Sequence, residues 1–196
     1  NPHAKFFKID IGEEDVEAIF KHGSFDAVNH HAAQIDVRKS VANPIFDARV
    51  NILGLINLLQ NCVKYEVKHF IFASTGGAIY GEQETFPASE SHPTHPLSPY
   101  GVAKLAGEHY LFFYNQIYGL NTTTLRYANV YGPRQDPHGE AGVVAIFTQK
   151  FLRGEQPVIN GDGMQTRDFV YVGDVAKANA LALSHKGGGI FNIGTG

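Results

Sequence analysis

Short apolar segments rich in β-forming residues alternate with stretches of helical character along this chain, and this alternation constrains its fold most. Strands that alternate with helices form a parallel sheet covered by helices on both faces. We therefore predict an α/β fold with a Rossmann-like, doubly wound parallel sheet. The expected strands are Phe6–Asp10, Ala27–His30, His69–Ser74, Thr122–Tyr127 and Ile190–Ile193.

Capping residues support the helices expected between these strands. Asn43 precedes Pro44 and Ser98 precedes Pro99, so each pair offers an N-cap followed by a proline in the first turn. Gly119 is suited to end the second of these helices. The expected helices are Glu13–Lys21, Pro44–Tyr65, Ser98–Tyr118 and Val143–Arg153.

The regular alternation ends after Tyr127, where a stretch with glycine and proline runs from Asn129 to Gly142. We interpret this break as the boundary between two regions. Residues 1–128 are expected to form a dinucleotide-binding, Rossmann-like domain that lacks its first βαβ segment. Residues 129–196 are expected to form a smaller, mostly substrate-binding region, with a late strand that returns to the main sheet.

Composition excludes several classes of protein. Apolar residues make up 43% of the chain and charged residues 18%, which is typical of a globular protein. A formal charge of −3 provides no basic field, so nucleic acid is not an expected partner. No apolar run is long enough to span a membrane, and the single cysteine favours a cytoplasmic location. The chain starts at Asn1 and stops at Gly196, each directly beside a strand-like segment, so we expect both ends to be truncated.

Tyr100 and Lys104 are the first candidates for chemistry. They are spaced so that their side chains share one face of a helix. A nearby ammonium lowers the pKa of a tyrosine, and the resulting phenolate could take the hydroxyl proton of an alcohol while a hydride leaves the same carbon. This spacing is common, however, and by itself it favours an ordinary surface pair.

The segment from Ser74 to Gly81 changes that balance. It combines two hydroxyl side chains with glycines directly after the expected strand His69–Ser74. Ligands of open α/β sheets bind beyond the carboxyl ends of the strands, and glycine lets the backbone approach a ligand closely. An ordinary glycine-rich turn remains an equally good interpretation of this segment alone.

Taken together, the blocks resemble the extended short-chain dehydrogenase/reductase family of NAD-dependent epimerases and dehydratases, most closely its UDP-glucose 4-epimerase branch. They follow the order and approximate spacing of that family over nearly the whole chain. The blocks are His30–Ala33, Asn51 with Gly54 and Leu58-Leu59, Ser74–Gly81, Tyr100 with Lys104, Leu125–Arg134 and Gly161–Asp174.

The resemblance implies a role for each candidate residue. Tyr100 would be the catalytic base, Lys104 would tune it and hold the nicotinamide ribose, and Thr75 would be the active-site hydroxyl. Because this chain has one extra residue before Tyr80, Ser74 remains an alternative to Thr75, and it also counts among the cofactor contacts. The remaining cofactor contacts would be Asp10, Ile11, His31, Ala32, Ala33, Asn51 and Tyr127, and the substrate diphosphate would be held by Asn129 and Arg167.

The implied activity is NAD-dependent epimerisation at C4 of a UDP-sugar, UDP-glucose or UDP-galactose, through a 4-keto intermediate. Other sugar-nucleotide enzymes of the family, including epimerases of UDP-glucuronate or N-acetylated sugars, dehydratases and decarboxylases, remain alternatives. Gly76 and Gly77 stand where the family's dehydratases carry an acidic pair, which argues against dehydration. A non-catalytic nucleotide-binding module is the alternative from another class, although it predicts the loss of Tyr100 or Lys104.

One departure from the family is large. The glycine-rich turn that holds the cofactor pyrophosphate is absent, as is the acidic residue that follows it. Both precede the segment at Phe6 in the family, so we expect the chain to be a fragment.

Two further expectations concern metal and oligomeric state. No metal site is expected, because His92 and His95 lie in a proline-rich loop without further ligands. A homodimer is expected because two helices carry more apolar residues than one sheet-facing stripe needs. Those residues are Leu53, Leu55, Ile56, Leu111, Phe112 and Phe113.

Overall fold

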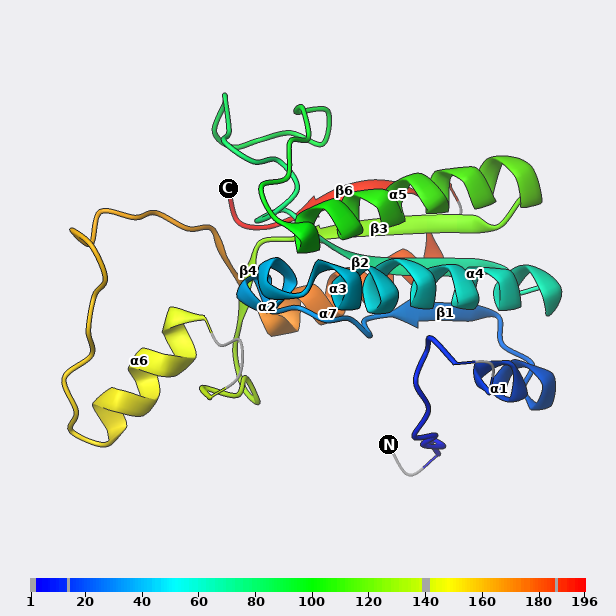
Figure 1. The fold of residues 1–196 in the computed structure, drawn as a ribbon, viewed down its shortest axis with the longest axis horizontal. Coiled ribbons are helices and arrows are strands. Elements are labelled where there is room, and N and C mark those ends of the chain that lie inside the picture. Colours follow the sequence, from blue (N-terminus) through cyan, green and yellow to red (C-terminus); the bar gives the residue numbers. More distant parts are fainter. Residues whose placement is uncertain (1–2, 14, 139–141, 186) are drawn as a thin grey trace.

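A parallel sheet of four strands in the order β1-β2-β3-β6 forms the centre of the molecule (Figure 1). The computed structural model describes residues 3–13, 15–138, 142–185 and 187–196. The strands are β1 (Ala27–His30), β2 (His69–Thr75), β3 (Asn121–Tyr127) and β6 (Gly189–Ile193). Every pairing in this sheet is parallel. The predicted Rossmann-like α/β fold is confirmed, and four of the five predicted strands form, with boundaries displaced by no more than one residue.

Helices cover both faces of this sheet, because successive side chains of a strand point to opposite sides. Phe70 and Phe72 pack into the cluster formed with α4 and α5, whereas Ile71 packs with Ala182 of α7 on the other face. The helices are α1 (Val16–His22), α2 (Val37–Ala42), α3 (Pro44–Ala48), the π-helical segment η1 (Arg49–Leu53), α4 (Gly54–Lys64), α5 (Pro99–Tyr118), α6 (Val143–Leu152) and α7 (Val172–Ser184).

The two predicted proline-started helices form as their caps require. Asn43 Oδ1 accepts a hydrogen bond from Phe46 N at 3.1 Å, and Ser98 Oγ accepts one from Gly101 N at 3.1 Å. The first helix contains a π-helical turn that the sequence did not indicate, η1. The second ends at Gly119, whose φ of 69° lies in the left-handed region that glycine favours.

The predicted strand Phe6–Asp10 is wrong, since the structure has no regular secondary structure there. A strand needs a neighbour to satisfy its backbone N–H and C=O groups. Strand β1 pairs only with β2 among the described residues, and the segment lies instead beside α4, where Ile9 and Ile11 pack against the core. The predicted helix from Glu13 begins later, as α1, although Glu14 falls outside the described residues.

A second, two-stranded sheet follows the main one and was not predicted. Its parallel strands are β4 (Asn129–Tyr131) and β5 (Phe169–Tyr171), and α6 lies between them along the chain. Each strand has only three residues, too few for an alternating pattern to be recognised. Helices α2 and α7 were also missed, and α7 starts directly from β5 without a capping side chain. Part of the predicted loop 129–142 lies outside the described residues.

The long helices of the described chain are too polar or too short to cross a bilayer.

Candidate functional site

The carboxyl ends of β1, β2 and β3 lie together at one edge of the main sheet, because all three strands are parallel. His30 pairs with Phe72 and Thr75 pairs with Tyr127 in the registers of these strands. The segments that follow β1 and β2 carry most of the predicted site residues. The topology therefore brings residues distant in the sequence to one edge, where ligands of such sheets bind.

Lys104 is anchored in this edge from helix α5. Its side chain is only 4% exposed, and its Nζ donates a hydrogen bond to the Ala73 carbonyl at 2.8 Å. The ammonium also lies 4.8 Å from the ring centroid of Phe72 and 5.9 Å from that of Tyr100. The predicted Tyr100–Lys104 pair is thus assembled beside the end of β2.

Helix α5 approaches the segment after β2 so closely that only a glycine fits at the contact. A Cβ at Gly101 would lie 2.5 Å from the Ala78 carbonyl oxygen, a distance that real contacts do not reach. Gly101 therefore allows the first turn of α5, which carries Tyr100, to pack against the loop that follows Thr75.

Burial sets the protonation of the pair. Burial raises the pKa of Tyr100 to about 12, with a further rise from the Asp47 carboxylate. This outcome differs from the expectation that Lys104 lowers the pKa of Tyr100, because burial and the Asp47 carboxylate both raise it. Burial also lowers the pKa of Lys104 to about 8, although the charge of Asp47 opposes that shift.

Ser74 and Thr75 have different environments. Ser74 is buried, and its hydroxyl donates to Glu108 Oε1 at 2.6 Å. Glu108 in turn accepts two hydrogen bonds from Arg126, one to each carboxylate oxygen, at 3.0 and 2.6 Å. Thr75 is half-buried at the end of β2, so its hydroxyl lies at the sheet edge while that of Ser74 is used inside the protein.

The Glu108–Arg126 ion pair extends toward the loop after Gly81. Arg126 Nη1 donates to Tyr80 Oη at 2.9 Å and to the Glu90 carbonyl at 3.0 Å. Tyr80 donates to Asn192 Oδ1 of β6 at 2.6 Å. Sequence reasoning missed this network, although Glu108 lies one helical turn after Lys104 and offered a signal.

Tyr127 lies at the end of β3 and is held by two polar side chains. His31 Nε2 is 3.1 Å from the Tyr127 hydroxyl, and the two rings stack with centroids 5.9 Å apart. Asn179 of α7 donates to the same hydroxyl at 2.7 Å. Partial burial and the nearby Lys104 charge lower the pKa of His31. The structure thus brings the predicted residues His31 and Tyr127 into contact. Asn179 was not predicted, because its contact depends on where α7 packs.

Asn51 has a structural place beside the predicted cofactor contacts. Its Oδ1 accepts a hydrogen bond from Gln34 N at 2.9 Å, and its Nδ2 donates to the Gln34 carbonyl at 2.9 Å and to Asp47 Oδ1 at 3.0 Å. The predicted contacts Ala32 and Ala33 lie between His31 and this anchor. Asn51 therefore holds the segment after β1 in place.

Asp10 and Ile11 lie beside the start of α4. Asn57 Nδ2 donates to the Ile11 carbonyl at 2.8 Å, and Asp10 Oδ1 accepts from Gly12 N at 2.9 Å. A Cβ at Gly54 would lie 2.8 Å from Ile11 Cδ1, so the segment and the helix are in close contact.

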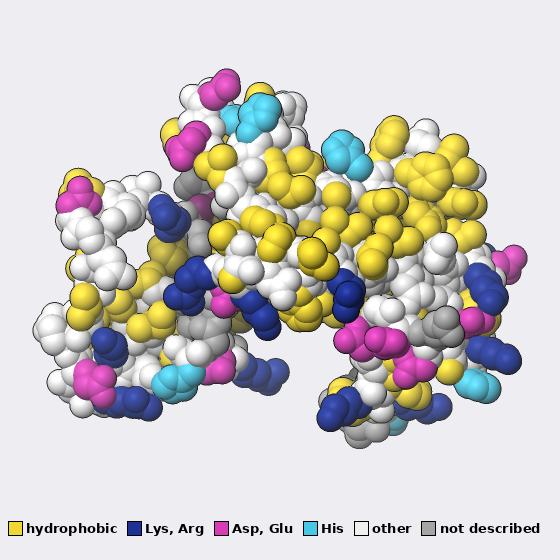
Figure 2. All heavy atoms as spheres, in the orientation of Figure 1, with side chains coloured by type: hydrophobic (Ala, Val, Ile, Leu, Met, Phe, Trp, Pro, Cys, Tyr) yellow, Lys and Arg dark blue, Asp and Glu magenta, His cyan; other side chains and the backbone are white. Residues whose placement is uncertain are grey.

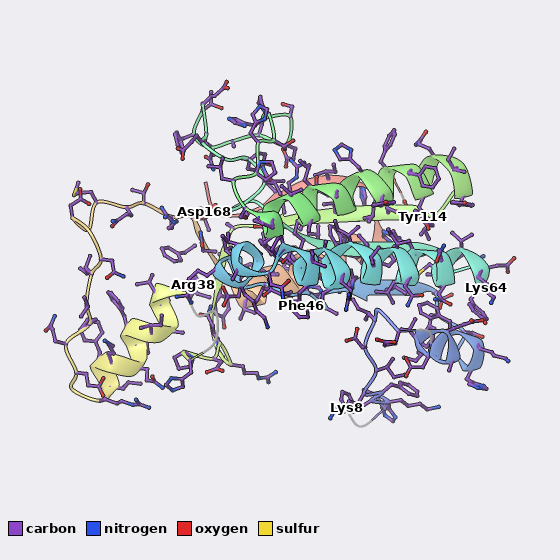
Figure 3. All side chains as sticks on the ribbon, in the orientation of Figure 1. Lys8, Arg38, Phe46, Lys64, Tyr114 and Asp168 are labelled. Atoms are coloured by element: carbon purple, nitrogen blue, oxygen red, sulfur yellow. The ribbon has the colours of Figure 1, made fainter. Side chains whose placement is uncertain are left out.

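Asn129 starts β4 and Arg167 lies just before β5, so the small sheet carries both residues. Asn129 pairs with Phe169 in the register of β4 and β5, and its Nδ2 donates to the Asp168 carbonyl at 3.0 Å. The Asp168 side chain, labelled in Figure 3, accepts hydrogen bonds from Thr195 after β6. Both predicted substrate contacts are exposed, so their amide and guanidinium groups are accessible from solvent.

The residues at the sheet edge could hold a cofactor such as NAD, because they offer free hydrogen-bonding capacity there. An ammonium has three donors, and among the described residues Lys104 Nζ has one hydrogen-bond acceptor, the Ala73 carbonyl. The small side chains of Ala32 and Ala33 leave the backbone after β1 accessible on the same edge. The described residues contain no cluster of three metal-ligating side chains.

Comparison with known proteins places the chain in a family. Residues 1–194 match the NAD dependent epimerase/dehydratase family. A putative UDP-glucose 4-epimerase from Methanocaldococcus jannaschii is 53% identical over 196 residues, which are 100% of this chain and 64% of that protein.

Two solved structures are also similar. The UDP-glucose 4-epimerase of Thermotoga maritima, crystallised with UDP-glucose, has a TM-score of 0.97 at 53% identity, over 100% of this chain and 64% of that one. The UDP-glucose 4-epimerase of Thermus thermophilus, in complex with NAD, has a TM-score of 0.93 at 51% identity, over 100% and 65%. The chain thus spans about 64% of the length of the relative from Methanocaldococcus jannaschii. By sequence and by fold it belongs to the NAD dependent epimerase/dehydratase family.

Proposed function

We propose that the full-length protein containing this chain is an NAD-dependent epimerase that inverts C4 of a UDP-sugar, UDP-glucose or UDP-galactose, through a 4-keto intermediate. The observation that carries the proposal is the placement of Tyr100 and Lys104 beside the end of β2, with Lys104 Nζ bonded to the Ala73 carbonyl. The similarity to proteins named UDP-glucose 4-epimerase supports the choice of sugar.

In this proposal Tyr100 moves the proton. Its phenolate takes the proton of the C4 hydroxyl when the sugar is oxidised, and the phenol returns it when the ketone is reduced. NAD, when bound, would accept and return the hydride and would contribute a positive charge in its oxidised form. Because burial raises the pKa of Tyr100 to about 12, the phenolate depends on such positive charge, of which Lys104 supplies one.

Thr75 is the proposed partner of Tyr100. Its hydroxyl at the end of β2 would hydrogen-bond the C4 oxygen, whereas Ser74 is occupied by Glu108. On the substrate side, Asn129 and Arg167 would hold the diphosphate, since a guanidinium can donate two parallel hydrogen bonds to two phosphate oxygens. We accordingly assign cofactor binding to residues 1–128 and most substrate contacts to residues 129–196.

The test is turnover of UDP-galactose by the full-length protein and by its Tyr100→Phe variant. We expect conversion to UDP-glucose by the wild type and a loss of kcat of at least about 100-fold in the variant, because the proton acceptor is removed. Unchanged kcat in Tyr100→Phe would exclude the base role. A wild type that holds NAD but converts no UDP-hexose would exclude the epimerase function.

The alternatives from the same family differ in the sugar. Gly76 and Gly77 follow Thr75, so the acidic pair expected of a dehydratase is absent at that place. The substrates UDP-glucuronate and the N-acetylated UDP-sugars differ from UDP-glucose in the substituent at C5 or at C2 of the sugar. Incubation with a panel of these UDP-sugars separates the candidates by the product formed.

We also propose that the protein is a homodimer through the outer surface of α3, η1 and α5. Figure 2 shows hydrophobic side chains gathered over these helices. The exposed members are Ile45, Leu53, Val102, Phe112, Phe113 and Ile117. Of the residues named from the sequence, Leu55 and Leu111 instead belong to the core, where they pack on the main sheet.

A further inference from the structure

Asp47 in helix α3 is a buried charge that the proposed reaction does not use. Asp47 is only 1% exposed, and its Oδ1 accepts hydrogen bonds from Gln34 Nε2 at 2.9 Å and from Asn51 Nδ2 at 3.0 Å. Its Oδ2 is buried and has no hydrogen-bond partner among the described residues. A buried carboxylate with an unpartnered oxygen is costly unless a positive charge compensates it.

A buried cation, Lys104, lies on the helix that packs against α3. Helix α3 packs against α5, and the start of α5 lies next to α2 and α3 in Figure 1. Asp47 and Ala103, the neighbour of Lys104, line the same hollow between the two helices. Over the described residues, neither Asp47 nor Lys104 forms an ion pair at contact distance. Their attraction acts at longer range, between two buried side chains on packed helices, and the Asp47 charge raises the pKa of Lys104.

Asp47 also supports the segment after β1. Gln34 donates its backbone N–H to Asn51 and its side-chain amide to Asp47, so the three residues form one closed network. This network holds the chain just after His31, Ala32 and Ala33, the residues assigned to the cofactor.

We propose that Asp47 is a positioning residue of the Tyr100–Lys104 pair: it holds the segment after β1 through Gln34 and Asn51, and its negative charge keeps the buried Lys104 ammonium protonated. The importance of the pair for turnover rests on the proposed function, whereas the charge coupling does not.

The expected direction follows from the groups around Lys104. Burial lowers the pKa of Lys104 to about 8 and the Asp47 charge raises it, so removing that charge lowers the pKa further. Burial and Asp47 both raise the pKa of Tyr100, so this pKa also falls without Asp47. The other groups coupled to Lys104 are His30 of β1 and His31 just after it. Burial and the Lys104 charge lower the pKa of each, which favours the neutral imidazole.

The direct test titrates Lys104 by NMR in full-length protein labelled with ¹⁵N-lysine, with the signal assigned through Lys104→Met. Asp47→Asn keeps an oxygen for Gln34 and Asn51 and removes only the charge. We expect the Lys104 titration midpoint to move to lower pH by about 1. Asp26→Asn, the same change at an exposed position before β1, should leave the midpoint in place. An unmoved midpoint in folded Asp47→Asn would overturn the proposal.

A double-mutant cycle, measured as unfolding temperatures, tests the charge role even if Asp47→Asn folds poorly. We expect Asp47→Asn to lower the unfolding temperature less in the Lys104→Met background than in the wild type, because no buried cation is then left unpaired. An equal loss in both backgrounds, or a double variant that fails to fold while Lys104→Met folds, would show that Asp47 acts independently of Lys104 and refute the charge role.

The pH dependence of kcat provides the functional readout. In Asp47→Asn both limbs of the profile should move to lower pH, because the pKa values of Tyr100 and Lys104 both fall. A purely structural role would lower kcat without moving the limbs, and that result would refute the coupling. If the wild type converts no sugar nucleotide, the proposed function fails, and the NMR titration still decides the role of Asp47.

Discussion

At the scale of single residues, burial controls the chemistry of the site more than sequence spacing does. Tyr100 and Lys104 share a helix face, as their spacing predicts. Desolvation nevertheless raises the pKa of Tyr100 and lowers that of Lys104, so it favours the neutral form of both. His30 shows the same effect in β1. Its ring contacts those of Phe70 and Phe72, and burial lowers its pKa to about 3. None of these shifts can be calculated from the order of residues, because each depends on what surrounds the side chain.

The two hydroxyls at the end of β2 lead to a prediction at this scale. Thr75→Ala in the full-length protein should lower kcat for UDP-galactose by about 100-fold, because a hydrogen-bond donor to the reacting oxygen is lost. Thr75→Ser should restore most of the activity.

Ser74→Ala is the matched comparison. It should destabilise the fold by roughly 1.5–3 kcal/mol in urea unfolding, since Glu108 loses a charged hydrogen bond, while kcat changes only a few-fold. The reverse pattern of activities would assign the catalytic hydroxyl to Ser74.

At the scale of elements, contact between helix and sheet overrides helix propensity. Gly107 lies within α5, where alanine is normally favoured by about 0.5–1 kcal/mol. A Cβ at this position, however, would lie 2.8 Å from Phe72 Cζ and 2.9 Å from Leu55 Cδ2. Gly107 thus lets α5 approach both β2 and α4, and this approach sets the distance between Lys104 and the sheet.

Gly107→Ala is therefore expected to destabilise the protein by about 1–3 kcal/mol, because overpacking outweighs the gain in propensity. Urea unfolding monitored by circular dichroism measures the change. His109→Ala, at an exposed position of the same helix, should alter the free energy of unfolding by less than about 0.5 kcal/mol. A stabilised Gly107→Ala variant would mean that the contact is looser than the structure indicates.

At the scale of the whole molecule, the exposed apolar surface over α3, η1 and α5 supports the proposed homodimer. Phe112 is 66% exposed and Ile117 is 63% exposed, and both lie on the outer side of α5. Monomers rarely expose large contiguous patches of this kind. Pairing two copies of this surface would remove it from water, and it would place the outer side of α5 in the interface while its inner side carries Lys104.

We expect the full-length protein to sediment as a dimer at micromolar concentration. Phe112→Asp should shift it to a monomer, because burying two unpaired carboxylates in the interface is costly. Leu152→Asp, at an exposed position of α6 outside this surface, is the control and should remain dimeric. A wild type that sediments as a monomer would refute the homodimer.

Periodicity and capping residues were sufficient to predict the main sheet and the two proline-started helices, because these signals are local. Asn43 and Ser98 cap their helices as predicted, and β1, β2, β3 and β6 lie where apolar runs indicated them. The blocks around Tyr100 were likewise sufficient to indicate the family.

The tertiary structure decided what depends on neighbours distant along the chain. Residues 6–10 do not form a strand, because a strand needs a partner that a local pattern cannot supply. The engagement of Ser74 with Glu108, and of Asn179 with Tyr127, required the register of the sheet and the position of α7. The sequence by itself therefore determined which elements form and which chemical groups are present. Only packing decided which of those groups are buried, paired and charged, because desolvation and electrostatic coupling act through space.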